Sequence, residues 1–106
     1  MRTRAKICGI TRSQDIQAVV NAGADAIGFV FFPPSPRHGS ATQAKELIRH
    51  VPAYVQTVGL FVNATADDIA DVLKQVALDI IQFHGDETPE DCQAIAAQVG
   101  RRWYKA

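Results

Sequence analysis

The fold is decided near the start of the chain, by the stretch Lys6-Ile7-Cys8-Gly9-Ile10-Thr11. Residues 5–10 form a short apolar run with a thiol near its end, and a Gly and a Thr then turn the chain into an amphipathic segment. This pattern predicts a buried strand that carries Cys8 near its carboxyl end. Catalytic groups of parallel α/β proteins lie at the carboxyl ends of the strands, so Cys8 is the first candidate for chemistry.

The same unit of strand, loop and helix recurs along the chain. Apolar stripes at i, i+3, i+4 and i+7 predict four helices over residues 16–23, 44–51, 69–76 and 92–99. Strands are predicted at 5–10, 26–31, 57–62 and 80–84, with a fifth that begins near residue 102. The strands are nearly continuous apolar runs, which are typical of strands covered on both faces. The order predicts an α/β fold with a parallel sheet and right-handed crossovers.

Helix boundaries are marked by capping residues. Pro89 is placed at a first helical position, where its missing N–H costs nothing. Gly23 and Gly100 are placed as C-terminal stops. Three pairs have capping-box spacing, two of them with Asp in place of the usual Glu or Gln: Ser40 with Gln43, Thr65 with Asp68, and Thr88 with Asp91.

Composition restricts the class of protein. The chain has 106 residues and a formal net charge of zero, which predicts one small domain and excludes a basic nucleic-acid-binding surface. We find no apolar run near the ~20 residues that span a membrane and no apolar segment after the basic residues 1–4. Cys8 and Cys92 have neither metal-binding nor CxxC spacing, so we expect free thiols and a cytoplasmic location.

Two features indicate a larger fold with an active-site loop. Residues 32–39 form the one long predicted loop, and its Pro33-Pro34-Ser35-Pro36 sequence is too rigid for helix or strand. The sequence stops at Ala106, inside the predicted fifth strand. An open five-stranded sheet is one interpretation, and a piece of a larger barrel fits the abrupt stop better.

Several segments together resemble the phosphoribosylanthranilate isomerase family of tryptophan biosynthesis, in order and spacing, over essentially the whole chain. They are residues 6–11, 23–31, the Pro-rich loop that closes on Ser35-Pro36-Arg37, 58–63 (Val-Gly-Leu-Phe-Val-Asn) and 81–87 (Ile-Gln-Phe-His-Gly-Asp-Glu). The resemblance implies a TIM (β/α)8 barrel, a fold of ~200 residues or more. Residues 1–106 would then be its N-terminal half, a single truncated domain with about four βα units and the start of strand five.

The resemblance also implies a reaction. It is the Amadori rearrangement of N-(5-phosphoribosyl)anthranilate, an aldose–ketose isomerisation that needs an acid, a base and no cofactor. Cys8 matches the family's general base. The family's general acid and its phosphate-binding loops belong to the half that this sequence lacks. A thiol with a pKa near 8.5 needs help to ionise, and Lys6 shares a face with Cys8 if the strand is regular.

Further residues are candidates for substrate binding. Arg37 matches the family's arginine for the anthranilate carboxylate, which a guanidinium pairs bidentately. Gln82 and His84 share a face by alternation at the end of the fourth strand. Lys6 completes the set, with Asn63 as a weaker candidate. Cys92 is expected to pack structurally in the core, and Asp86 and Glu87 are expected to favour a helix N-terminus.

Two other hypotheses remain open from the sequence. In the first, the chain is a non-catalytic half-barrel whose open edge strands pair with a second copy or with a complementary half. In the second, it is another sugar-phosphate barrel enzyme, although Cys8 together with Arg37 argues against this. A full-length protein is expected to be a monomer or homodimer, with a small phosphosugar substrate and neither nucleic acid nor membrane as a partner.

Overall fold

The computed structural model describes residues 6–8, 12–31 and 41–105, with side chains described for 12–31 and 43–105. Strands and helices alternate throughout this part of the chain, which confirms the predicted order. The elements are β1 (Lys6–Cys8), α1 (Ser13–Asn21), β2 (Ala26–Val30), α2 (Ala41–Ile48), β3 (Gln56–Phe61), α3 (Ala66–Leu73), β4 (Ile80–Phe83), α4 (Pro89–Val99) and β5 (Arg102–Lys105).

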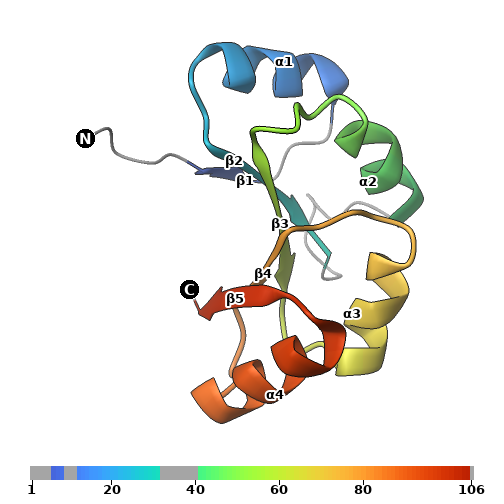
Figure 1. Ribbon diagram of the computed structural model, residues 1–106, viewed down its shortest axis with the longest axis vertical. Coiled ribbons are helices and arrows are strands. Elements are labelled where there is room, and N and C mark those ends of the chain that lie inside the picture. The colour runs from blue at the N-terminus through green and yellow to red at the C-terminus, as the bar shows by residue number, and fades with distance from the viewer. Residues whose placement is uncertain (1–5, 9–11, 32–40, 106) are drawn as a thin grey trace.

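The strands form one parallel sheet in the order β1-β2-β3-β4-β5, so each strand pairs with the one before it in the chain. The four helices follow one another in an arc along one side of this sheet, from α1 in blue to α4 in orange (Figure 1). A parallel sheet covered by the helices of successive βα units is the arrangement expected for part of a (β/α) barrel.

The core lies between the sheet and the helices. Alternate strand residues point into it and meet the apolar stripes of the helices. From the strands come Ile27, Phe29, Phe61, Ile81 and Phe83, and from the helices Ile16, Ala44, Ile69 and Cys92. Each of these side chains is almost completely buried. Burying such a side chain contributes roughly 1.5–3 kcal/mol, so this layer is the main source of stability.

The other alternate residues lie on the opposite face of the sheet, which we call the inner face. The register aligns Cys8, Gly28, Val58, Ile80 and Arg102 in one row. A second row, nearer the carboxyl ends of the strands, contains Val30, Leu60, Gln82 and Tyr104. The inner face therefore carries candidate site residues, whereas the helix-facing side carries the core.

The predicted helix caps are confirmed where the structure describes them. Thr65 and Thr88 each accept a hydrogen bond from the backbone N–H three residues on, at 3.1 Å. Asp68 and Asp91 return the bond to the cap backbone, so both capping boxes are complete. Gly100 ends α4 with φ of 72°, the left-handed conformation that glycine tolerates best. Ser40 lies outside the described residues, as does the loop of residues 32–39.

Three of the helices end two or three residues before their apolar stripes do. Gly23, Val51 and Val76 were assigned to helices, and that assignment is wrong because α1, α2 and α3 end at Asn21, Ile48 and Leu73. Val76 is nonetheless buried. Apolar periodicity reports burial, and burial continues into the turn after the helix. Gly23 acts as the predicted stop, with φ of 93°.

Hydrogen bonds also join β3 to the segment just before β4, at the amino ends of the strands and far from the candidate site. The buried Thr57 hydroxyl lies 2.9 Å from the carbonyl oxygen of Ala77 and 3.1 Å from a carboxylate oxygen of Asp79. The backbone N–H of Asp79 donates back to that hydroxyl at 3.1 Å. Side-chain contacts at this end of a βα fold contribute to stability rather than to chemistry. In the described residues, no helix is long and apolar enough to cross a membrane.

Candidate active site

Gln82 lies on the inner face of β4 and is buried, with 6% of its surface exposed. Its neighbour across the ladder is Tyr104 of β5, the residue in register with it. The Tyr104 hydroxyl donates to Oε1 of Gln82 at 2.8 Å. A buried amide needs hydrogen-bond partners, and this bond supplies one of them while it fixes the position of the amide. Sequence reasoning selected Gln82 but missed Tyr104.

His84 follows β4 directly and is exposed. Its backbone N–H donates to the carbonyl of Phe61 at 3.0 Å, which extends the ladder with β3 by one residue beyond Phe83. His84 is thereby held at the carboxyl end of the sheet, two residues from Gln82 on the same strand. An imidazole at this position is accessible to a ligand and can donate or accept a hydrogen bond.

Cys8 and Lys6 are described through their backbone alone. Cys8 is the last residue of β1 and pairs in register with Gly28, and Lys6 pairs with Ala26. The pairing is regular, so both belong by alternation to the set of positions that contains Gln82. Arg37 lies outside the described residues.

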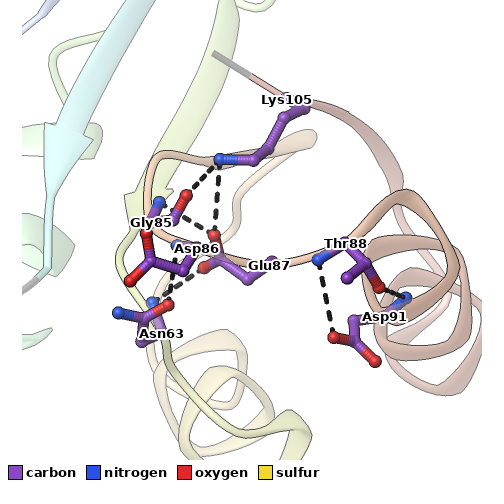
Figure 2. Close-up of polar contacts among 7 residues, drawn as sticks. All are labelled: Asn63, Gly85, Asp86, Glu87, Thr88, Asp91 and Lys105. Atoms are coloured by element: carbon purple, nitrogen blue, oxygen red, sulfur yellow. Dashed lines mark hydrogen bonds and ion pairs between the residues drawn. The ribbon is translucent and has the colours of Figure 1, made fainter.

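A buried carboxylate joins the turns that follow β3 and β4. Glu87 has a side chain that is 5% exposed, and it accepts hydrogen bonds from the backbone N–H groups of Asn63, at 2.7 Å, and Gly85, at 2.8 Å. Lys105, at the end of β5, lies 3.7 Å from the same carboxylate and also donates to the carbonyl of Gly85. Figure 2 shows the carboxylate between these groups. The Glu87 carboxylate accepts its hydrogen bonds from the turns after β3 and β4, and the electrostatic effect of Asp86 and Glu87 on the N-terminus of the next helix stays a prediction.

Asn63 completes the contact between the two turns. Its side-chain carbonyl accepts a hydrogen bond from the backbone N–H of Asp86 at 2.9 Å. Its φ of 51° lies in the left-handed region, which asparagine tolerates better than most residues. A Cβ on Gly85 would lie 2.5 Å from Oδ1 of Asn63, so only glycine fits at this close approach. Asn63 therefore stabilises the turns at the carboxyl ends of β3 and β4, which we call the rim of the sheet. The sequence analysis named Asn63 as a weaker candidate for substrate binding.

The electrostatics of Glu87 favour its charged form. Burial raises the pKa of this carboxyl, but the hydrogen bonds from backbone N–H groups and the nearby Lys105 ammonium together hold the pKa below its usual value. Cys92 behaves in the opposite way, because burial and the neighbouring Glu87 charge raise the pKa of its thiol. Cys92 is completely buried on α4, which confirms its predicted structural packing.

Two cavities lie beside the turn after β3, on the side of the sheet that the helices cover and not on the inner face. One, of about 310 Å³, is lined by Asn63, Glu87 and residues of α4 that include Ile95. The other, of about 350 Å³, lies between Phe61 and residues of α3 that include Val72. Neither is lined by Gln82 or His84. In the parts of the chain that the structure describes, no group of three His, Cys, Asp or Glu residues could hold a metal ion.

Comparison with known proteins decides the family. The family model described as N-(5'phosphoribosyl)anthranilate (PRA) isomerase matches residues 5–105. The chain belongs to the phosphoribosylanthranilate isomerase family. A curated phosphoribosylanthranilate isomerase of Acinetobacter calcoaceticus is 76% identical over 106 residues, which are 100% of this chain and 50% of that protein.

Solved structures of the isomerase family have the same fold. One is a phosphoribosylanthranilate isomerase in complex with reduced 1-(o-carboxyphenylamino)-1-deoxyribulose 5-phosphate. It is 41% identical with a TM-score of 0.91, over 98% of this chain and 53% of that one. Another, of monomers generated from the dimeric Thermotoga maritima isomerase, is 40% identical with a TM-score of 0.88, over 98% of this chain and 52% of that one. The chain thus spans about half the length of the relatives it matches, as a part of their TIM-barrel-type fold.

Proposed function

We propose that residues 1–106 are the N-terminal half of a phosphoribosylanthranilate isomerase barrel, acting in tryptophan biosynthesis. The observation that carries this is the 76% identity to the Acinetobacter calcoaceticus isomerase along the whole of this chain. The register adds support, since Cys8 and Gln82 belong to the same set of alternating positions at the carboxyl ends of the strands. The proposed substrate is N-(5-phosphoribosyl)anthranilate.

The reaction requires two proton transfers. An acid protonates the ring oxygen of the ribose, the C1–O bond breaks, and the open chain carries a protonated imine between C1 and the anthranilate nitrogen. Cys8, as thiolate, then takes the proton from C2, and the electrons move into the imine to give an enolamine. Tautomerisation of the enolamine yields the aminoketose. The protonated imine is already the electron sink, so the reaction as proposed uses no cofactor. The acid is proposed to lie in the second half of the barrel.

The remaining residues are proposed to bind the substrate. Arg37 pairs with the anthranilate carboxylate, a role that suits a planar guanidinium. Gln82, His84 and Lys6 contact the substrate, and the Lys6 ammonium also favours the thiolate form of Cys8. Cys92, the free thiol among the described residues, suits a reducing compartment, and we propose a cytoplasmic location.

A chimera tests this function. It joins this chain to the remaining half of the Acinetobacter calcoaceticus isomerase, and turnover is followed by the loss of phosphoribosylanthranilate fluorescence. We expect the chimera to be active and the 106-residue chain alone to be inactive. Cys8→Ser should abolish turnover, and Cys92→Ala, the matched control in the core, should retain it. A folded chimera without activity, or one that keeps full activity with Cys8→Ser, would contradict the proposal.

A second candidate function is a non-catalytic half-barrel that associates with another copy. Its support is that β1 and β5, in the described part of the chain, each pair along one edge only. Unpaired strand edges favour pairing with another chain. Sedimentation of the 106-residue chain distinguishes the two: a defined dimer favours this candidate, whereas a monomer that gains activity when the second half is added favours the isomerase.

A further inference from the structure

Glu87 is the one described residue of the rim whose side chain contacts three separate strand ends. Its Oε2 accepts from the backbone of Asn63, after β3, and its Oε1 accepts from the backbone of Gly85, after β4. The same Oε1 lies 3.7 Å from the ammonium of Lys105, at the end of β5. Figure 2 shows these contacts converging on one carboxylate. The two bonds are short, and bonds to an ionised acceptor are stronger than neutral ones.

These contacts determine how His84 is held. The N–H of His84 is bonded to Phe61, and the next N–H, of Gly85, is bonded to Glu87. The carbonyl of Gly85 accepts from Lys105. Both peptide groups that flank His84 are thus tied to neighbouring elements, one of them through Glu87. The turn has little freedom to shift toward β3, because Gly85 already approaches Asn63 closely.

We propose that Glu87 is a positioning residue for the isomerase reaction, which acts by fixing the backbone that presents His84 to the substrate. The inference rests on the proposed function and deepens it, since it assigns a role to a residue that does not face the substrate itself. Lys105 is its partner, and the amide of Asn63 supports the same turn from the other side. Loss of the Glu87 charge should misplace His84 without removing it.

A double-mutant cycle in the chimera tests this coupling. Glu87→Gln keeps the size of the side chain, removes its charge, and replaces one acceptor with a donor. We expect kcat/KM to fall about 10- to 100-fold, since small displacements at a site have costs of this order. In the His84→Ala background, the same change should cause little further loss, because residues that act through one another are not additive. Glu90→Gln is the matched control, an exposed glutamate of α4 near Glu87.

A second measurement does not depend on activity. Histidine-selective NMR should show the ring resonances of His84 shifted or broadened by Glu87→Gln and unchanged by Glu90→Gln, with the exposed His50 as internal reference. If Glu87→Gln prevents folding, Lys105→Met removes the ion pair while it leaves the two backbone bonds to the carboxylate. It should give a smaller effect of the same kind.

The outcomes separate the two proposals. An equal loss of kcat/KM in both backgrounds, with unmoved His84 resonances, overturns the role of Glu87 and leaves the isomerase function standing. Full activity of His84→Ala would show that His84 does not contact the substrate. It would overturn the role of Glu87 as well, but it would not contradict the proposed reaction. An inactive, folded chimera contradicts the proposed function, and in that case the His84 resonances still show whether Glu87 positions the imidazole.

Discussion

Tyr104 donates its hydroxyl hydrogen to Oε1 of Gln82, 2.8 Å away on the neighbouring strand. The two residues are register partners on the inner face, and Gln82 is buried whereas Tyr104 is 37% exposed. The amide is therefore held from the β5 side. If Gln82 contacts the substrate, Tyr104 helps to position the amide that makes this contact. No sequence motif identified Tyr104.

Tyr104→Phe in the chimera should lower kcat/KM about fivefold, because a hydrogen bond that positions the amide contributes roughly 1 kcal/mol. The ring and its packing remain, but the buried Gln82 amide loses this donor, so a modest fall in the thermal midpoint is also expected. Tyr54→Phe is the control, because Tyr54 is 80% exposed and lies outside the sheet. Equal kinetics for both variants would show that Tyr104 does not support Gln82.

Gly85→Ala should destabilise the chimera by about 1–3 kcal/mol, since the added methyl group overlaps Asn63. Urea unfolding measures this loss. Asn63→Ala removes the overlapping side-chain atoms, so the same glycine change should cost less in that background. Additive losses in the two backgrounds would mean that crowding against the Asn63 side chain is not the cause.

Acid should weaken the contribution of Glu87 to stability. The pKa of this carboxyl is lower in the folded protein than in the unfolded chain, so its contribution is fully present above the unfolded value of about 4.3. The contribution disappears as pH falls through the folded pKa. We expect the difference in unfolding free energy between wild type and Glu87→Gln to be large at pH 6 and to shrink toward pH 3. With the exposed Glu90→Gln, the difference should stay small at every pH. If the unfolding free energy of the wild type exceeded that of Glu87→Gln by more at pH 3 than at pH 6, the pKa of Glu87 would be raised in the folded protein and not lowered.

Thr57→Val should cost about 1–3 kcal/mol of stability, because it removes the hydroxyl that bonds Asp79 and leaves buried polar groups without that partner. The site is at the amino ends of the strands, so kcat/KM should be unchanged at a temperature where the variant is folded. Denaturant unfolding and steady-state kinetics on the same sample check both statements. A lower kcat/KM without a lower free energy of unfolding would contradict the assignment of Thr57 to stability rather than to chemistry.

The Cys92 thiol should be unreactive in the folded protein. It is completely buried, and its raised pKa keeps it protonated. Iodoacetamide, followed by mass spectrometry of the peptide that contains Cys92, should show modification only after unfolding. Rapid labelling under native conditions would mean that α4 opens locally. The Cys8 peptide, labelled in parallel, provides a comparison for the thiol proposed to act as base.

Local signals in the sequence predicted most of the fold. The capping boxes at Thr65 and Thr88 act within four residues, and continuous apolar runs identify the strands, so both can be identified without knowledge of tertiary contacts. The role of Glu87 depends on Asn63 and Lys105, which are distant in the chain and become neighbours only when β3, β4 and β5 align. Tyr104 was missed for the same reason, since its position beside Gln82 follows from the register. The roles of Cys8, Lys6, Arg37, Gln82 and His84 stay predictions.

The strand order of the sheet has a consequence for synthesis on the ribosome. Because every strand pairs with its predecessor in the chain, a nascent polypeptide can add strands one at a time as they emerge, without waiting for a distant partner. The turn contacts between Asn63 and Glu87 can form once α4 begins to emerge, but their counter-charge, Lys105, follows 18 residues after Glu87. Until then the carboxylate would be buried without its cation. Translation should therefore pass through a short-lived stage in which the sheet is largely assembled and the turns at the carboxyl ends of its strands are not yet fixed.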